Sequence, residues 1–347
     1  MMNRRDVMIA MAMAGAAAAS QSVLAGAKDI SASEHDWDWL IGNWDVWHRR
    51  LKERLAGNDD WQEFNGKSVF WTTLNGLGNL DDNVVELPDG IYRGLSIRSF
   101  DPATRQWAIW WLDGRYPTRL DPPVLGRIEA DSGTFVGQDT FKGRPITVRF
   151  RWLDIHSKRP NWEQAFSPDG GKTWEVNWRN YFTRTNARPT SLPRLDDAPR
   201  DWDFLAGTWQ VRNRRLKRDN QWEGFDNTLT NWSVLGGFGN VDSETFNAPG
   251  GVYRGVSLRA YDRDTKQWLR WWMDGRNPSQ ITMSERGSFK DGVGTFIGDD
   301  TLNGKPLKVR SQWSRITPSS ARWEQASSAD NGATWQTTWL AELTRKA

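Results

Sequence analysis

Two arginines occupy equivalent places on stretches of sequence that are otherwise apolar. Arg93 alternates into the apolar face of residues 91–100, and Arg254 does the same in residues 252–258. An unpaired buried charge is costly, so each arginine needs an anion or an internal acid beside it. A ligand carboxylate can accept two hydrogen bonds from one guanidinium, which makes both arginines candidate anion anchors. The internal acids that could pair with them instead include Asp113, Asp139 and Glu163.

Tryptophans accompany an acid and an arginine on the next predicted strand. Trp107, Trp111 and Asp113 share one face, and Arg115 follows in a turn. The later copy of this pattern consists of Trp268, Trp272, Asp274 and Arg276. Such a combination suits a flat or ring-shaped ligand, because ring stacking supplies contact area and the polar groups fix orientation. Alternatively, the tryptophans fill a core and the acid bonds the arginine at its rim.

Four acids are candidates for proton transfer. Glu163 and Glu324 each lie between a tryptophan and a glutamine in a predicted strand. A buried carboxyl group with a raised pKa can act as a general acid or base, so these two join Asp113 and Asp274 as candidate catalytic residues. Exposure of the two glutamates on an outer strand face is the alternative.

Composition excludes several classes of chemistry. Cysteine is absent and histidine occurs three times, which excludes disulfides, thiol catalysis and a histidine-rich metal cage. No Ser-His-Asp arrangement or phosphate loop is recognisable, and we predict neither a metal nor a cofactor. The net charge of +3 gives no basic excess of the kind that binds nucleic acid.

The candidate residues come in pairs because the chain contains one unit twice. Asp36–Trp44 returns as Asp201–Trp209, and after a loop that differs by four residues the offset settles at 161. All 11 tryptophans of the second unit have a tryptophan partner in the first. A proline-containing stretch without apolar periodicity separates the units. We therefore predict domains over 35–184 and 201–347, joined by a linker at 185–200.

None of the three histidines has a histidine partner in the other unit. His48 and His156 match Arg212 and Thr317 in the second unit. If only one copy became an active site, these histidines mark the first copy. Otherwise they are ordinary surface residues.

Each unit is predicted to be all-β. Residues 146–152 and 174–182 alternate between apolar and polar side chains, and the copy repeats both patterns. Turn signals such as Pro88-Asp89-Gly90 and Lys142-Gly143 separate these runs at hairpin spacing. We predict roughly eight to ten antiparallel strands per unit, closed into a barrel or folded into a sandwich.

One repeated motif has to be reconciled with a barrel. Ser167–Trp174 and Ser328–Trp335 resemble the Asp-box turn of sialidase propellers. A propeller would repeat this turn once per blade of about 40–50 residues, whereas the two copies lie one whole unit apart. We interpret them as structural hairpin turns.

A second motif opens each unit. Gly42-Asn43-Trp44 and Gly207-Thr208-Trp209 resemble the Gly-x-Trp at the start of the first strand in lipocalins and fatty-acid-binding proteins. The resemblance implies that Arg184 and Arg345, at the ends of the last strands, stack over the two motif tryptophans. The chain as a whole resembles tandem lipocalin-like barrels of bacterial families.

The first 27 residues are typical of an export signal. Arg4 and Arg5 precede the apolar stretch 7–19, and Ala25-Gly26-Ala27 offers a cleavage site. The paired arginines favour twin-arginine export, so we expect a periplasmic or secreted protein without stable membrane insertion. The alternative is a membrane anchor, but the apolar run is short for a span of about 30 Å.

Three functions compete at the level of sequence. The first is binding of a small apolar or aromatic, possibly acidic, ligand in tryptophan-lined cavities. The second is a cofactor-independent isomerase or lyase that uses the same cavity, with an acid as proton-transfer group. The third is carbohydrate binding, which requires exposed, coplanar tryptophans.

Overall fold

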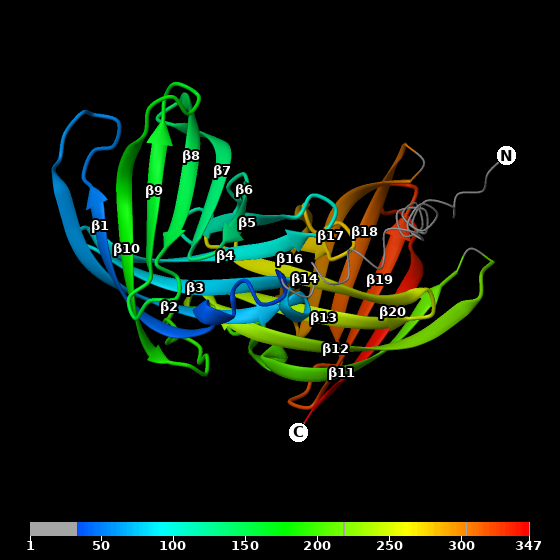
Figure 1. The fold of residues 1–347 in the computed structure, drawn as a ribbon. Helices are drawn as coiled ribbons and strands as arrows, with labels where there is room; N and C mark the ends of the chain where they lie inside the picture. Colours follow the sequence, from blue (N-terminus) through cyan, green and yellow to red (C-terminus); the bar gives the residue numbers. More distant parts are fainter. Residues whose placement is uncertain (1–32, 218, 303, 347) are drawn as a thin grey trace, which may run out of the picture. The chain divides into compact units, whose positions relative to one another are not determined.

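A computed structural model describes residues 33–217, 219–302 and 304–346. Within these residues the chain forms two closed barrels, each of ten antiparallel strands (Figure 1). The all-β prediction is confirmed, and closure of each sheet excludes the sandwich alternative. The candidate export signal over 1–27 lies outside the described residues.

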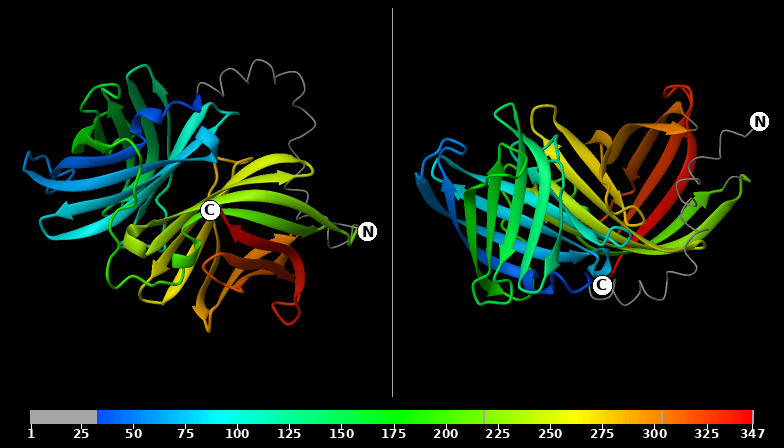
Figure 2. Two further views of the ribbon diagram at one scale, coloured as in Figure 1. Left: turned by 90° about the horizontal axis from the view of Figure 1, so that it is seen from below. Right: turned by 45° about the horizontal axis from the view of Figure 1, so that its top comes forward.

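Every strand pairs with its neighbour in the chain, and the first strand of each barrel closes on the last (Figure 2). The first barrel consists of β1 (Gly42–Leu51), β2 (Trp61–Thr73), β3 (Gly78–Leu87), β4 (Gly90–Asp101), β5 (Gln106–Asp113), β6 (Val124–Glu129), β7 (Ser132–Phe141), β8 (Arg144–Leu153), β9 (Asn161–Ser167) and β10 (Glu175–Asn186). The second consists of β11 (Gly207–Leu216), β12 (Trp222–Val234), β13 (Gly239–Ala248), β14 (Gly251–Asp262), β15 (Gln267–Asp274), β16 (Thr282–Lys290), β17 (Val293–Leu302), β18 (Lys305–Ser314), β19 (Ser320–Ser328) and β20 (Gln336–Arg345). The short helical turns are η1 (Asp38–Leu40), η2 (Leu74–Gly76), η3 (Asp203–Leu205) and η4 (Leu235–Gly237).

Aromatic rings fill one end of each barrel. Trp37, just before η1, is 3% exposed, and its ring lies 5.8 Å from that of Trp107 and 5.9 Å from that of Phe135. Trp202 takes the same place in the second barrel, 6.2 Å from Trp268. This packing leaves the opposite end of each barrel as the place for a cavity.

The predicted arginine lids, Arg184 stacked over Trp44 and Arg345 stacked over Trp209, are confirmed. The guanidinium of Arg184 lies 4.1 Å from the ring centroid of Trp44, and that of Arg345 lies 4.3 Å from Trp209. Each arginine also donates to backbone carbonyls that flank the 3-10 turn before the first strand, such as that of Ile41 for Arg184. The stacked cation thus fastens the last strand to the start of the first.

The two Asp-box segments are hairpin turns, as predicted. Asp169 accepts hydrogen bonds from the backbone N–H groups of Lys172 (3.0 Å) and Thr173 (2.9 Å) between β9 and β10. Gly171 has a φ of +94°, a conformation that favours glycine. Asp330 makes the corresponding bond to Thr334 at 2.9 Å.

The described residues contain no helix with the length and apolar character needed to span a membrane.

Candidate functional site

Each barrel contains an internal cavity. The first measures about 370 Å³ and the second about 640 Å³. Both volumes fall within the range of about 300–1,000 Å³ that is usual for small-molecule sites. The lining residues come from the inward faces of the strands and from the loops at the ends opposite the tryptophan core.

In each barrel, one of the two tryptophans predicted to form an aromatic wall lines the cavity. Trp111 and Trp272 line the two cavities. Each ring lies against a glycine of the neighbouring strand: a Cβ placed on Gly94 would lie 2.3 Å from the ring of Trp111, and one on Gly255 would lie 2.1 Å from that of Trp272. The glycines therefore allow the indoles to lie flat on the barrel wall.

The acid and arginine predicted beside each wall bond each other. Arg115 donates to Asp113 at 3.0 and 2.6 Å, and its guanidinium lies 3.8 Å from the ring centroid of Tyr92. Arg276 and Asp274 repeat this pair in the second barrel at 2.8 and 2.5 Å. Both pairs line the cavities, so the alternative of an internal pair at the rim describes them correctly.

Trp107 and Trp268 do not line the cavities. Each is 1% exposed within the aromatic core. Their indole nitrogens donate to Asp36 (2.8 Å) and Asp201 (2.9 Å). The prediction that they form ligand walls is wrong, and both are structural residues. They share the inward face of their strand with cavity residues, but they lie farther along it, at the filled end of the barrel.

The prediction that Arg93 and Arg254 point into the barrels is wrong. The cavity side of β4 carries Tyr92, Ser96 and Arg98, so Arg93 lies on the other face. Its Nη2 donates to the carbonyl oxygen of Pro193 at 2.7 Å. Arg254 occupies the same non-cavity face of β14. Successive residues of a strand point to opposite faces. The inward face of β4 carries polar side chains, so the apolar row that includes Arg93 points away from the cavity.

Glu163 and Glu324 also lie outside the cavities. The cavity is lined by the residues on either side of each glutamate. Glu163 forms ion pairs with Arg151 (3.2 Å) and Arg179 (4.0 Å). Glu324 accepts from Thr337 Oγ1 at 2.8 Å. The predicted acid–base role in the cavity is therefore wrong for both. Both lie on the strand face away from the cavity, but the alternative of an exposed carboxyl group does not hold for Glu163, which is buried there at 9% exposure.

Sequence reasoning missed a buried ion pair in each cavity. Arg98 donates to Asp81 at 2.7 Å and to Asn79 at 2.8 Å, and both charged side chains are less than 5% exposed. Arg259 and Asp242 form the same pair at 2.8 Å. The signal was present as the repeated spacings Asn-x-Asp and Ser-x-Arg in both units.

The two cavities differ where His48 lines the first. Nδ1 of His48 lies 2.6 Å from Oδ1 of Asn180 and 3.2 Å from the indole nitrogen of Trp178, and in the second barrel the indole of Trp339 donates to Asn213 at 2.9 Å. The counterpart of His48 is therefore Asn213, which corrects the assignment of Arg212. Burial lowers the pKa of His48 to about 4, so the imidazole is neutral at pH 7. A Cβ on Gly66 would lie 2.5 Å from its Nε2, so this glycine makes room for the ring.

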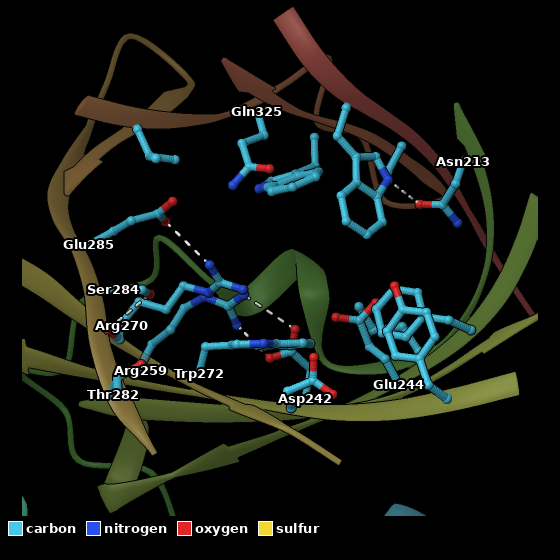
Figure 3. A pocket seen from close by; sticks show the side chains of 18 of the residues that line it. Asn213, Asp242, Glu244, Arg259, Arg270, Trp272, Thr282, Ser284, Glu285 and Gln325 are labelled. Atoms are coloured by element: carbon cyan, nitrogen blue, oxygen red, sulfur yellow. Dashed lines mark hydrogen bonds and ion pairs between the residues drawn. The ribbon is translucent and has the colours of Figure 1, made fainter. Parts of the chain in front are cut away.

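Two residues that face each other across neighbouring strands differ in type between the two barrels. Ile109 faces Val124 across β5 and β6 of the first barrel. At the equivalent positions of the second barrel, Arg270 faces Glu285, and their charged atoms lie 3.5 Å apart. An apolar contact has thus been exchanged for an ion pair inside the cavity (Figure 3).

A further change introduces a carboxyl group. Asn83 of the first cavity corresponds to Glu244 of the second, which accepts from Asn227 Nδ2 at 2.6 Å. Burial and the nearby Asp242 raise the pKa of Glu244 to about 8.

The charged side chains that line the two cavities differ in their balance. Five arginines and four aspartates line the first cavity: Arg50, Arg54, Arg98, Arg115, Arg119, Asp81, Asp113, Asp121 and Asp139. Three arginines and six acids line the second: Arg259, Arg270, Arg276, Asp242, Glu244, Asp274, Glu285, Asp299 and Asp300.

The positive excess of the first cavity comes from Arg50 and Arg54. Among the described residues neither forms an ion pair with a carboxylate. Arg50 faces Gln62 across the β1–β2 pair, whereas in the second barrel Arg215 faces Glu223 and bonds it at 2.5 Å. Burial lowers the pKa values of both arginines, that of Arg54 to about 10, so both are charged at pH 7.

A metal centre has no support in the part of the chain that the structure describes. No group of three or more histidine, cysteine, aspartate or glutamate side chains there could hold a metal ion.

Comparisons with known proteins find similar structures only. No protein-family model matches the chain, and no curated protein matches it. A protein of unknown function from the DUF3598 family of Nostoc punctiforme is 12% identical, with a TM-score of 0.29, over 90% of this chain and 99% of that one. Rv2717c from M. tuberculosis is 16% identical, with a TM-score of 0.31, over 44% of this chain and 100% of that one. An S-type phycobiliprotein lyase, CPES, from Guillardia theta is 11% identical, with a TM-score of 0.28, over 42% and 90%. At these scores the matches assign neither a ligand nor a reaction to this chain.

Proposed function

We propose that the first barrel binds a small aromatic or apolar molecule with an acidic group, and that Arg50 and Arg54 anchor its anion. The observation that carries the proposal is this pair of arginines in the cavity lining without a carboxylate partner among the described residues. They take over the role that the sequence suggested for Arg93.

The setting of the two arginines favours a bound anion. Burial disfavours each charge, and the two guanidinium groups disfavour each other. Both are held over aromatic rings: Arg50 lies 5.2 Å from the ring of Trp178, and Arg54 lies 4.7 Å from that of Phe141. A carboxylate or sulfonate placed between them would relieve the repulsion and accept charge-assisted hydrogen bonds.

The rest of the cavity favours an aromatic or apolar body. The cavity walls also include Phe70, Val85, Ile109, Trp111 and Phe166. Transfer of a ring from water to such a surface supplies the binding free energy, while the arginines fix its orientation.

The two alternative functions have weaker support. Sugar binding requires exposed, coplanar tryptophans, and among the exposed large apolar residues of the described chain Trp222 is the one tryptophan, at 36%. The acids that the sequence suggested for an isomerase or lyase do not support that function, because Asp113 is paired with Arg115 and Glu163 lies outside the cavity.

Export belongs to the same proposal. We infer from the sequence that residues 1–27 direct export and that cleavage leaves Lys28 first. The mass of the protein recovered from the periplasmic fraction of its host tests this, and an intact first segment would contradict it.

A matched pair of fluorescent probes tests the ligand class. The anion 8-anilinonaphthalene-1-sulfonate and its uncharged relative N-phenyl-1-naphthylamine share the aromatic body and differ in the sulfonate. One charge-assisted hydrogen bond contributes about 1.5–3 kcal/mol, so Arg54→Gln and Arg50→Gln should each weaken binding of the anion by about ten-fold to a hundred-fold. Both variants should leave the affinity for the uncharged probe within about three-fold.

Arg127→Gln, an exposed arginine on β6, is the control and should not change either affinity. Equal losses for both probes would show that the arginines only support the cavity shape. An unchanged affinity for the sulfonate in both variants would refute the proposal.

A further inference from the structure

We propose that the second barrel binds a small organic cation, an amine or alkylammonium group, with Glu244 as its counter-ion and the rings of Phe246 and Trp272 as its walls. The site does not share a residue with the arginine pair of the first barrel. The proposal therefore stands independently of the function proposed above.

Glu244 is the buried acid of this cavity that has no cationic partner among the described residues. The other acids form the ion pairs Asp242–Arg259 (2.8 Å), Glu285–Arg270 (3.5 Å), Asp274–Arg276 (2.5 Å) and Asp299–Lys308 (2.5 Å), while Asp300 is exposed. Glu244 has only the neutral amide of Asn227 at 2.6 Å. When Glu244 is ionised, the buried cluster has one negative charge in excess.

Aromatic residues occupy the positions next to Glu244 on the cavity wall. Glu244 pairs across β13 and β14 with Gly255, the residue on which the ring of Trp272 lies. Phe246 is the next inward residue on β13, stacked on Tyr253 at 4.6 Å and 6.3 Å from the ring of Trp272. Figure 3 shows Glu244, Trp272 and the two arginines Arg259 and Arg270 around the same cavity. A cation beside Glu244 would gain from both the carboxylate and the ring faces.

The equivalent position in the first barrel has no carboxylate that could bind a cation. Asn83, the counterpart of Glu244, is neutral and donates to Asp81 at 2.5 Å. Gly66 stands where Asn227 supports the carboxyl group. The acid and its supporting amide are thus specific to the second copy, in the cavity that carries the negative excess.

The release of a proton on binding, and the pH dependence of the affinity, provide a second test of the proposal. The groups that face Glu244 are Asp242 on its own strand, Asn227 on β12, Tyr253 and Arg259 on β14, and Arg270 on β15. Burial and Asp242 raise the pKa of Glu244 to about 8, so the empty cavity holds a proton there at pH 7. A bound cation would favour the carboxylate and expel that proton. Affinity should therefore rise as the pH rises towards 8 and then level off.

Calorimetric titration of the full chain with benzyltrimethylammonium tests both readouts, with benzyl alcohol as the uncharged aromatic comparison. Titrations at pH 7 in phosphate and in Tris count the protons that binding releases, and we expect close to one. Glu244→Gln should weaken binding of the cation by about ten-fold to a hundred-fold and abolish the proton release, while affinity for benzyl alcohol changes by less than about three-fold.

Glu342→Gln makes the same substitution in the same barrel at an exposed site on β20, and it should keep the wild-type affinity. Absence of binding by the wild type, equal affinity in wild type and Glu244→Gln, or an affinity that falls as the pH rises would each overturn the proposal. None of these results bears on the sulfonate probe, whose binding depends on Arg50 and Arg54.

Discussion

Replacement of His48 by asparagine should remove much of the acid sensitivity of the first barrel. His48 lines the cavity, its ring stacks on Phe64 at 4.9 Å, and burial lowers its pKa from 6.5 to about 4. Asparagine already serves at this place in the second barrel, where Asn213 accepts from Trp339. In the first barrel the introduced amide would offer an acceptor to Trp178 and a donor to Asn180, the two partners of the imidazole.

The magnitude follows from the difference between the folded and unfolded pKa values. Above pH 6.5 His48 is neutral in both states and its contribution is complete. Below pH 6.5 the unfolded chain takes up a proton that the folded barrel resists, so stability falls by about 1.4 kcal/mol per pH unit until the folded group titrates near pH 4. The wild type should therefore lose about 3 kcal/mol relative to His48→Asn between pH 7 and pH 4.

Urea unfolding, followed by tryptophan fluorescence at half-unit pH steps from 7 to 4, measures this difference. Subtraction of the two curves cancels the groups that both proteins share. His156→Asn, which removes an exposed histidine, should follow the wild-type curve. A difference between wild type and His48→Asn that stays constant within about 0.5 kcal/mol over this range would refute the assignment of a buried, neutral imidazole.

Two further substitutions test the cavity walls. Arg259→Met should destabilise the second barrel by about 3–5 kcal/mol, because it leaves Asp242, at 1% exposure, as an uncompensated buried charge; a loss below about 1 kcal/mol in urea unfolding would contradict this. Gly94→Ala should cost about 1–3 kcal/mol and shift the fluorescence of Trp111, since the new Cβ would lie 2.3 Å from its ring. An unchanged unfolding midpoint and spectrum would show that the indole does not lie on Gly94.

The amino-acid sequence by itself determined the architecture. The 161-residue repeat, the alternation of apolar residues and the turn signals are local patterns, and they predicted two β units with about the observed number of strands. The arginine lids over Trp44 and Trp209 and the two Asp-box turns were also predictable, because each depends on a short motif whose chemistry is carried by its own residues.

Only the tertiary structure decided which residues enter the cavities. A strand presents alternate residues to opposite faces, and a sequence does not say which face is inward when both contain buried residues. That is why Arg93 and Glu163 were assigned to the interior, while the buried pair of Arg98 and Asp81 was missed.

The differences between the two copies also needed the barrel. Arg270 and Glu285 are 15 residues apart in sequence and meet only through the register of β15 and β16, and Glu244 meets Trp272 only across Gly255. A cavity is formed by residues distant along the chain, and its charge is the sum over strands that the closed sheet brings together. The sequence therefore determined that there are two similar barrels, and cross-strand pairing decided how the charged side chains of their interiors are balanced.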